Sequence, residues 1–263
     1  MDLGLRNETA LVVGASEGIG YECARALLEE GARVRICSRN ARKLEAAAAQ
    51  LAAASGQAVP WCDADITRAD DVERLTAWLR QESPRVDVLV VAVGGSRRAR
   101  FEELDDAGWL DNYEFNVLGV VRVVRAALPL LRQASAGRIV ILGAAGARMP
   151  YPNQVVSNVH KAGLIALVKT LAVEFQPYNI RVNSVSPGRT LTSLWIERAA
   201  KLAQERGVSP DDVIREFTHE IPMGRFGQPE EIAAMVVFLA SHKASYVTGQ
   251  SILVDGGIAR GLV

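Results

Sequence analysis

Seven short strand-like runs alternate with longer helical patterns along the whole 263-residue chain. Several of these runs are apolar throughout, as expected for strands that are buried on both faces of a parallel sheet. Parallel neighbours need right-handed crossovers, so helices must cover both faces. The pattern predicts an α/β fold, a single Rossmann-type domain over residues 1–263 with a doubly wound parallel sheet of about seven strands. The expected strands are residues 9–14, 33–38, 58–64, 86–93, 138–143, 180–187 and 251–255.

Helical patterns fill the intervals between the expected strands. The first, GIGYECARALLEEG, carries Ile19, Cys23 and Leu27 on one face and stops at Gly31, because glycine favours the left-handed backbone of a helix end. Residues 189–227 form a mostly helical excursion at the place where a substrate lid would lie. The other expected helices are residues 41–54, 69–82, 105–133, 155–176 and 229–241.

Charge and composition exclude several classes of function. The chain has 30 Lys and Arg against 30 Asp and Glu, so it lacks the basic excess of a nucleic-acid-binding protein. The short basic run Arg97, Arg98 and Arg100 indicates either a solvated loop or a contact to a small anionic substrate. The N-terminus shows no signal pattern, and no apolar run reaches membrane-spanning length. We therefore expect a cytoplasmic protein without a nucleic-acid or membrane partner.

The cysteine pattern points the same way. Cys23, Cys37 and Cys62 are scattered, and no two of them have CxxC spacing. An odd and scattered set is typical of small apolar side chains in a reducing compartment, and not of disulfides or metal ligands. The sequence therefore predicts no metal site.

A glycine-rich turn lies where the first strand meets the first helix, in VVGASEGIGYECARAL. Gly14, Gly18 and Gly20 would let the backbone turn tightly and approach a pyrophosphate, which the free N–H groups of the helix N-terminus would bind. A glycine triplet alone is a weak signal, but one between a strand and a helix at the start of a βαβ unit indicates a dinucleotide site. The alternative is a tight βα turn that binds no ligand.

The end of the second strand distinguishes the two dinucleotides. NAD sites place a carboxylate there for the ribose 2′-hydroxyl, whereas NADP sites accept the 2′-phosphate, often with Arg. Ser38 brings no negative charge and Arg39 can make a forked contact to phosphate, which favours NADP(H) as the cofactor. Glu17, within the glycine turn, argues mildly for NAD, and Arg39 as an ordinary surface arginine is the alternative.

Several segments resemble motifs of the short-chain dehydrogenase/reductase family, in family order and over nearly the whole chain. They are the GxxxGxG spacing of residues 14–20, FNVLG, NSVSPGRTLT and SYVTGQSILVDGG. The C-terminal part, IPMGRFGQPEEIAAMVVFLAS, is most similar to the members called 3-oxoacyl-ACP reductases. The resemblance implies an oxidoreductase acting on a small-molecule carbonyl or alcohol. It also implies a homo-tetramer with residues 105–133 and 155–176 at the interface.

The resemblance further implies roles for particular residues. Asn116 would be the structural member of the catalytic tetrad and would hold a helix bulge, while Lys161 would bind the nicotinamide ribose and lower the pKa of the catalytic acid. Asp65 would meet the adenine, and Ile66 would pack against it. The rest of the expected cofactor-binding set is Gly14, Ser16, Gly18, Ile19 and Gly20 in the glycine turn, Ser38 and Arg39 after the second strand, and Pro187, Gly188 and Thr192 at the nicotinamide.

Three features depart from the family pattern. The position of the catalytic tyrosine holds Ser157, that of the tetrad serine holds Ala144, and VAVG at residues 91–94 replaces the family's NNAG. Only Asn116 and Lys161 remain of the tetrad. The chain also resembles a subset of 3-oxoacyl-ACP-reductase-like members that carry Ser-Asn at this place, so we interpret Ser157 as the mark of a subgroup.

Ser157 is a poor direct replacement for tyrosine as an acid. A serine hydroxyl is far less acidic than a phenol and lies closer to the backbone, so Ser157 would reach a carbonyl oxygen only through a water. We expect His160 to face solvent and Tyr151 to pack on the surface as a loop aromatic. The alternatives are that His160, three residues after Ser157 on the same helix face, transfers the proton, or that Tyr151 swings toward the cleft. His219 and Trp195 are expected to pack within the lid.

Three functions stay open at this point. We favour an NADP(H)-dependent oxidoreductase that reduces a 3-oxoacyl-like carbonyl or oxidises a secondary alcohol, with Lys161, Asn116 and Ser157 as its catalytic residues and a water-relayed proton. The second is a catalytically weak or inactive protein that senses NADP(H) or partners an active relative. The third is a non-redox dehydratase or isomerase. The lid mixes apolar side chains with Arg189 and Arg198, which fits a partly apolar substrate that can carry an anionic group.

Overall fold

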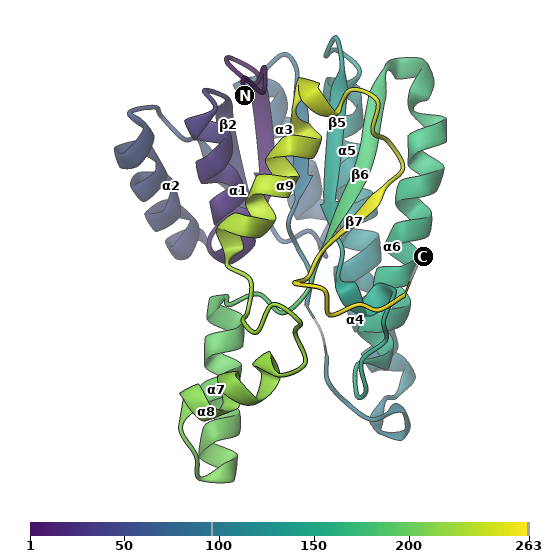
Figure 1. Cartoon of the computed structure of the whole chain (residues 1–263). Helices are drawn as coiled ribbons and strands as arrows, with labels where there is room; N and C mark the ends of the chain where they lie inside the picture. Colours follow the sequence, from purple (N-terminus) through teal and green to yellow (C-terminus); the bar gives the residue numbers. More distant parts are fainter. Residues whose placement is uncertain (96, 262–263) are drawn as a thin grey trace.

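Seven parallel strands form one twisted sheet in the order β3-β2-β1-β4-β5-β6-β7 (Figure 1). The structure, a computed structural model, describes residues 1–95 and 97–261. The strands are β1 (Thr9–Val13), β2 (Arg33–Ser38), β3 (Trp61–Asp63), β4 (Val88–Val91), β5 (Gly137–Leu142), β6 (Ile180–Pro187) and β7 (Ser251–Val254). The predicted α/β fold is confirmed, and each expected strand is present. The strand order reverses between β1 and β4, which creates a switch point at the carboxyl ends of these two strands.

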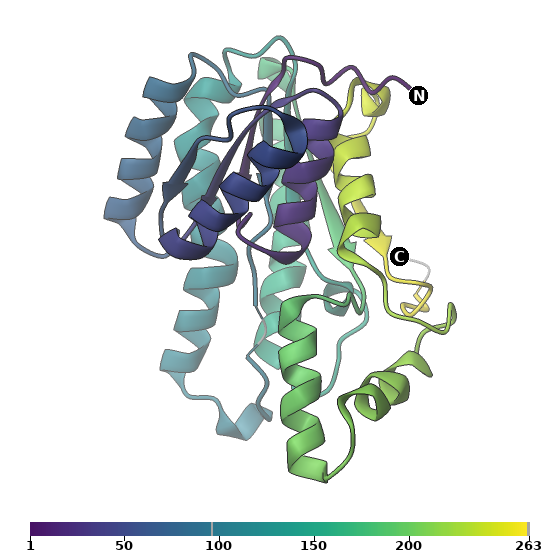
Figure 2. The ribbon, with the colours of Figure 1, turned by 90° about the vertical axis from the view of Figure 1, so that its left-hand side faces the viewer.

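Helices cover both faces of the sheet (Figure 2). One face packs against α1 (Gly18–Glu29), α2 (Ala41–Ser55) and α9 (Pro229–Ala240). The other packs against α3 (Ala69–Glu82), α5 (Gly119–Leu131) and α6 (Val155–Glu174). This arrangement explains why the strands are apolar without alternation, since both of their faces lie in a core.

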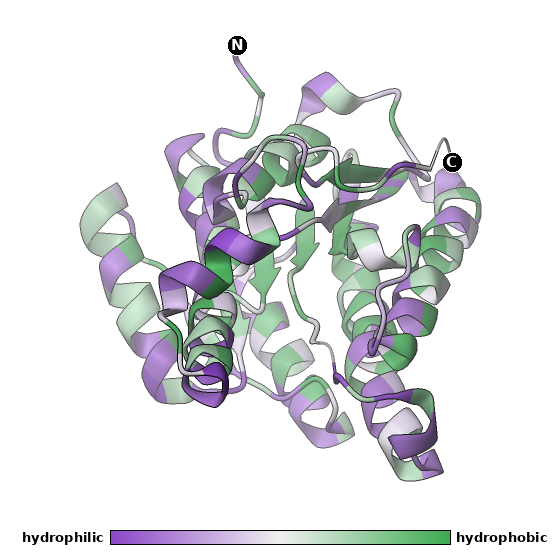
Figure 3. Ribbon diagram, turned by 60° about the horizontal axis from the view of Figure 1, so that its bottom comes forward, coloured by the Kyte–Doolittle hydropathy of each residue, from purple (hydrophilic) through white to green (hydrophobic). Residues whose placement is uncertain are grey.

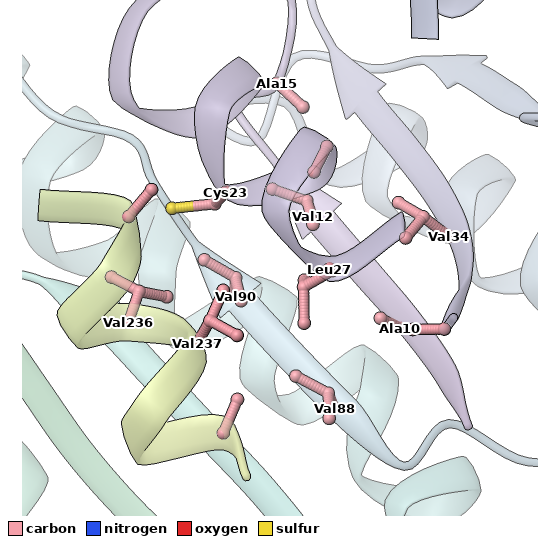
Figure 4. Packing of buried hydrophobic residues seen from close by; sticks show 14 of the residues in the cluster. Ala10, Val12, Ala15, Cys23, Leu27, Val34, Val88, Val90, Val236 and Val237 are labelled. Carbon is pink, nitrogen blue, oxygen red and sulfur yellow. The ribbon is translucent and has the colours of Figure 1, made fainter. Parts of the chain in front are cut away.

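Neighbouring residues of one strand enter different cores. Val12 lies in the core under α1 and α9, whereas Leu11 lies in the core on the opposite face. Cys23 and Leu27 of α1 pack with Val237 of α9 in the same core as Val12 (Figure 4). In Figure 3 the hydrophobic strands lie between helices that carry their hydrophilic residues mainly on the outside. Burying one such aliphatic side chain stabilises the fold by about 1.5–3 kcal/mol.

The helix expected over residues 105–133 contains one widened turn. α4 (Asp106–Tyr113) runs into π-helical residues Glu114–Leu118, which continue directly into α5. A π-helical turn holds one extra residue and so changes which side chains face inward. It places Asn116 inside the molecule with an exposed fraction of 0%. The helix bulge that the family resemblance implies is therefore present.

The excursion at residues 189–227 contains α7 (Ser193–Arg206) and α8 (Pro210–Thr218). Figure 1 shows both helices extending beyond the carboxyl edge of the sheet. A parallel bridge between Thr190 and Gly227 closes the base of the excursion. Its helices pack on each other through a small core of their own, so the excursion is a distinct flap at the edge where a ligand would bind.

α6 is the one helix, among the residues that the structure describes, whose length and apolar composition would suffice to cross a membrane. Leu164 and Val168 of α6 lie in the core against the sheet. Helices of a buried core pass the same test, and we interpret α6 as a core helix. Its outer face still exposes 50% of Val159 and 76% of Val173.

Candidate active site

Three adjoining cavities lie at the carboxyl edge of the sheet. The first cavity, of about 410 Å³, lies between the glycine turn and the end of β2. The central cavity, of about 220 Å³, lies around Lys161 and Ser157. The outer cavity, of about 110 Å³, lies around Tyr151 and Arg189. The first and central cavities share Ile19 as a wall, and the central and outer cavities share Ser157, so the three form one groove at the switch point of the sheet.

The glycine turn forms the floor of the first cavity. Gly14 has φ of +88°, a backbone conformation that other residues rarely adopt. A Cβ atom at Gly20 would overlap the carbonyl oxygen of Gly14, so this close approach requires glycine. α1 begins at Gly18, directly beside the cavity, and its first N–H groups are available to an anion. Ten residues of the expected cofactor set line the first cavity: Gly14, Ser16, Gly18, Ile19, Gly20, Ser38, Arg39, Asp65, Ile66 and Thr192.

The ribose end of the first cavity holds Ser38 and Arg39. Ser38 and Ser16 share a hydrogen bond of 3.0 Å between their hydroxyl oxygens. Arg39 is exposed, and its guanidinium lies 5.8 Å from the centroid of the Phe115 ring. In the described part of the chain Arg39 has no carboxylate within ion-pair distance. Its charge is therefore available to a ligand.

Lys43 is a functional candidate that the sequence reasoning missed. It lines the first cavity, and its Nζ lies 2.9 Å from Oε1 of Glu17. The hydrogen bond from Lys43 holds the pKa of Glu17 below its ordinary value. Ser193 donates a second hydrogen bond of 3.0 Å to Glu17. The negative charge of Glu17 is therefore balanced by Lys43. This ion pair weakens the argument for NAD, which rested on an unbalanced carboxylate at Glu17.

Lys161 lies at the centre of the groove with 4% of its surface exposed. Its Nζ donates to the carbonyl oxygen of Leu142 at 3.2 Å. A Cβ atom at Gly94 would overlap this Nζ, so the glycine makes room for the ammonium group. Burial lowers the pKa of Lys161 to about 8. The lysine therefore changes its protonation near neutral pH, which suits a group that moves a proton.

A buried hydrogen-bond chain runs from Asn116 to His160. Asn116 Nδ2 donates to the carbonyl oxygens of Gly95 and Asn112, both at 3.1 Å. Nδ1 of His160 lies 2.9 Å from Oδ1 of Asn112. The expectation that His160 faces solvent is wrong, because α4 packs across α6 and leaves only 8% of this histidine exposed. Burial lowers the pKa of His160.

The two replaced tetrad positions lie on one shared wall. Ser157 and Ala144 both line the central and the outer cavity. Ser157 is 6% exposed and lies one helical turn before Lys161, so the two side chains share a face of α6. The structure thus brings the expected catalytic residues Lys161 and Ser157 to one cavity, with Asn116 beside the Gly94–Gly95 stretch of its wall. Their catalytic role stays a prediction.

Tyr151 also faces the groove, contrary to the expectation that it packs on the surface. It lines the outer cavity, and its hydroxyl is buried with no hydrogen-bond partner in the described part of the chain. The side-chain amide of Asn158 donates to the carbonyl oxygen of Tyr151 at 2.9 Å and so fixes the loop against α6. Burial raises the pKa of the Tyr151 phenol. Sequence spacing could not show that Tyr151 faces the groove, because Tyr151 precedes the helix and the direction of its side chain depends on the loop.

The nicotinamide side of the groove is formed by the segment after β6. Pro187, Gly188 and Thr192 line the central cavity. Trp195 lines the central and outer cavities and also packs edge-on against Phe217 with ring centroids 5.3 Å apart. It is therefore both lid packing and cavity wall. The other residue expected to pack within the lid, His219, is exposed at the end of α8 and lines none of the three cavities.

No site with metal ligands stands out in residues 1–95 and 97–261, where no three His, Cys, Asp or Glu side chains gather. The cysteines Cys23, Cys37 and Cys62 are free and buried. Burial raises the pKa of the Cys23 and Cys37 thiols, which disfavours their reactive thiolate form.

The doubly wound sheet, the glycine turn and the groove at the switch point define the Rossmann class of dinucleotide-binding folds. A family model described as Enoyl-(Acyl carrier protein) reductase matches residues 14–259. The chain belongs to the short-chain dehydrogenase/reductase family and is a member of its oxidoreductases.

Named relatives cover almost the whole chain. "Dehydrogenase/reductase SDR family member 4" of Sus scrofa is 34% identical over 97% of this chain and 88% of the relative. The "3-oxoacyl-[acyl-carrier-protein] reductase FabG" of Chlamydia trachomatis is 32% identical over 97% of this chain and 98% of the relative. The crystal structure of L-sorbose reductase from Gluconobacter frateurii, complexed with NADPH and L-sorbose, has a TM-score of 0.96, 32% identity and full coverage of both chains.

Proposed function

We propose that the protein is an NADP(H)-dependent oxidoreductase that reduces a carbonyl of a 3-oxoacyl-like substrate or oxidises the corresponding secondary alcohol. The observation that carries the proposal is Arg39 at the ribose end of the first cavity, which forms no ion pair among the described residues. Arg39 is unpaired there and Lys43 neutralises Glu17, so a 2′-phosphate would meet attraction without an opposing free carboxylate in the glycine turn. The NADPH in the related L-sorbose reductase structure supports the same cofactor.

The residues present fit a dinucleotide along the groove. The glycine turn and the start of α1 would hold the pyrophosphate, and Asp65 and Ile66 would flank the adenine. Pro187, Gly188 and Thr192 would line the nicotinamide in the central cavity, with Lys161 at its ribose. The bound cofactor would supply the hydride for reduction. The protein must then deliver one proton to the carbonyl oxygen.

We assign the proton delivery to Lys161 and Ser157, through water where needed. The two side chains share one face of α6 and one cavity, and a hydroxyl can accept one proton while it donates another. Lys161 would lose the proton that the substrate oxygen gains. Its pKa of about 8 makes this transfer accessible near neutral pH. Asn116 would hold the Gly94–Gly95 segment beside Lys161 in place.

Tyr151 is assigned to substrate binding and not to proton donation. Its raised pKa makes the phenol a weaker acid than a free tyrosine. The buried hydroxyl has no hydrogen-bond partner among the residues that the structure describes, so a substrate oxygen in the outer cavity would satisfy it. Tyr151→Phe should therefore raise KM while kcat changes little. A loss of kcat in Tyr151→Phe, with normal turnover in Ser157→Ala, would reverse the two assignments.

Turnover tests the proposal directly. NADPH oxidation would be followed by absorbance with a panel that contains a 3-oxoacyl thioester, a ketose and a 2-oxo acid. We expect substrate-dependent oxidation that is lost in Lys161→Met, which replaces a buried ammonium with an apolar side chain of similar length. Equal turnover in Lys161→Met and the unchanged protein would contradict the proposed role of Lys161.

The replacement of two tetrad positions, now Ala144 and Ser157, favours a second candidate function. The chain would then bind NADP(H) without turnover, as a sensor or as the partner of an active relative. This function predicts tight NADPH binding and no NADPH oxidation across the whole panel. Substrate-dependent oxidation with any member of the panel would exclude it.

We also propose a cytoplasmic homo-tetramer that buries the outer faces of α4, α5 and α6. Val159 and Val173 on α6, with Leu110 and Tyr113 on α4, form exposed apolar surface on these helices. Apolar residues of this size are stabilised when a partner surface covers them. Light scattering should give a mass four times that of the chain. Val159→Glu should reduce this mass, and a monomeric unchanged protein would contradict the proposal.

A further inference from the structure

Three arginine side chains from separate segments meet around the ring of Trp195, beside the outer cavity. Arg98 lies in the loop after β4, Arg189 follows β6, and Arg198 lies on α7. Their guanidinium carbons lie 6.0, 5.4 and 4.3 Å, respectively, from the centroid of the Trp195 ring. Arg189 and Arg198 also lie over Phe217, at 4.6 and 5.2 Å. We call Arg98, Arg189 and Arg198 the arginine cluster.

The arginine cluster carries more positive charge than its surroundings neutralise. Glu220 forms an ion pair with Arg189. In the described ranges, no carboxylate lies within ion-pair distance of Arg98 or Arg198. Partial burial lowers the pKa of Arg198 to about 10, and repulsion by Arg98 and Arg189 adds to the effect. Two positive charges therefore remain without a counter-charge.

Stacking on Trp195 does not remove this charge. An aromatic face attracts a guanidinium through its quadrupole, but the net charge of the group stays. Like charges held close together near a partly buried ring disfavour the folded state. A bound anion would relieve that repulsion, so the cluster is better explained by a ligand than by stability.

Two polar atoms at the outer cavity point to the same ligand. Nε of Arg189 is buried, finds no hydrogen-bond partner in residues 1–95 and 97–261, and belongs to a side chain that is only 9% exposed. The Tyr151 hydroxyl is also buried without a partner. Both residues, together with Arg98 and Trp195, line the outer cavity. Both atoms carry a hydrogen to donate, so an oxyanion is the group that would satisfy them.

The outer cavity is continuous with the place of the chemistry. Ser157 and Ala144 form a wall that it shares with the central cavity, which Lys161 lines. A ligand in both cavities would place one end near Ser157 and the other near Arg98 and Arg189. The Trp195 ring lines both cavities and would contact the part of the ligand between the two ends.

We propose that the arginine cluster binds a carboxylate of the substrate, so that the protein acts on an oxo acid or a hydroxy acid. The carboxylate would lie in the outer cavity and the reacting carbon in the central cavity, with an apolar spacer against Trp195. The planar fork of arginine matches the two oxygens of a carboxylate. This inference rests on the proposed function, which supplies the reaction in the central cavity.

Binding of small probes tests the inference without turnover. Calorimetric titration of the NADP⁺-loaded protein would compare phenylacetate with phenylacetamide, which has the same shape and no charge. We expect phenylacetate to bind about tenfold or more tightly than the amide, because hydrogen bonds to a charged group are stronger. In Arg98→Gln this preference should fall to about threefold or less. Equal affinity for the two probes would overturn the inference.

Matched variants show that the effect belongs to the arginine cluster. Arg100→Gln is the control, since Arg100 lies two residues from Arg98, pairs with Glu103 and does not line the outer cavity. It should keep the full preference. Arg198→Gln should weaken the preference without a loss of folding, because Arg198 has no carboxylate partner. A preference that survives in both Arg98→Gln and Arg198→Gln would also overturn the inference.

Two further outcomes are informative. Phenyl phosphate that binds while phenylacetate does not would contradict the carboxylate and assign the cluster to a phosphate. The titration is also separable from the turnover assay. A normal preference for phenylacetate with no NADPH oxidation would contradict only the proposed function. Turnover of neutral ketones with no preference for phenylacetate would contradict only this inference.

Discussion

The first cavity and the central cavity share walls, yet they relate differently to the family pattern. The first cavity holds the glycine turn with the spacing GxxxGxG, and a Cβ at Gly20 would overlap the backbone of the turn. The central cavity holds Ala144 and Ser157 where the family has a serine and a tyrosine. One end of a site can therefore keep its geometry while the adjoining end changes its chemistry.

The two cavities also differ in how their charged side chains are balanced. In the first cavity the carboxylate of Glu17 is neutralised by Lys43. In the central cavity Lys161 is buried, none of the described lining residues is a carboxylate, and burial lowers its pKa to about 8. The first cavity is thus arranged to hold an anion, whereas the central cavity is arranged to move a proton.

The largest effect is expected at Lys161. Lys161→Met should reduce kcat by about 10²-fold or more, in the range typical for loss of a general acid. The fold should survive, because methionine suits a buried position. Steady-state kinetics would measure the rate, and circular dichroism would check the fold. A variant that keeps its rate would show that the central cavity moves no proton through this residue.

A smaller loss is expected at Ser157. Ser157→Ala should reduce kcat by about 10-fold or more, since water can replace part of the hydroxyl relay. NADPH affinity should stay unchanged, because Ser157 lines the central and outer cavities but not the first. Kinetics and calorimetry on the same preparation would separate the two readouts. A change in affinity with a normal rate would contradict the division between the cavities.

The pH profile should show the state of Lys161. Burial lowers its pKa to about 8, so the ammonium that donates the proton is present below pH 8 and lost above it. For reduction, kcat should be level below this pH and fall about tenfold per unit above it. Alcohol oxidation needs the neutral amine, so its kcat should rise over the same range. Parallel profiles in the two directions would contradict the relay.

The mildest change is expected in the first cavity. Arg39→Ala should weaken NADPH binding by about tenfold through loss of a charge-assisted contact to the 2′-phosphate. NADH lacks that phosphate, so its affinity should change little. Calorimetry would give both values. An equal loss for both dinucleotides would show that Arg39 acts on the shared part of the cofactor.

Much of the fold and of the first cavity was predictable from the sequence. Buried strands and glycine turns can be recognised from the local sequence. A strand buried on both faces needs a continuous apolar run, and a tight turn needs glycine for its backbone geometry. The glycine turn, Ser38 and Arg39 accordingly lie together around the first cavity. The widened turn at Asn116 followed from the family resemblance and not from periodicity, which predicted an uninterrupted helix.

The misses share a physical cause. His160 was expected to face solvent. This expectation failed because helical periodicity shows which side chains share a face of the helix but does not show which other helix covers that face. Here α4 covers it. Tyr151 turned inward for a similar reason, since its direction is set by a loop held by Asn158. The pairing of Lys43 with Glu17 joins residues 26 positions apart and also needed the fold.

The most direct test of the account is the affinity of the unchanged protein for NADPH and for NADH, measured by calorimetric titration. The account predicts that NADPH binds at least about tenfold more tightly, because only its 2′-phosphate reaches Arg39 and Lys43. Equal or stronger binding of NADH would contradict the assignment of the first cavity. Failure to bind either dinucleotide would contradict the oxidoreductase function itself.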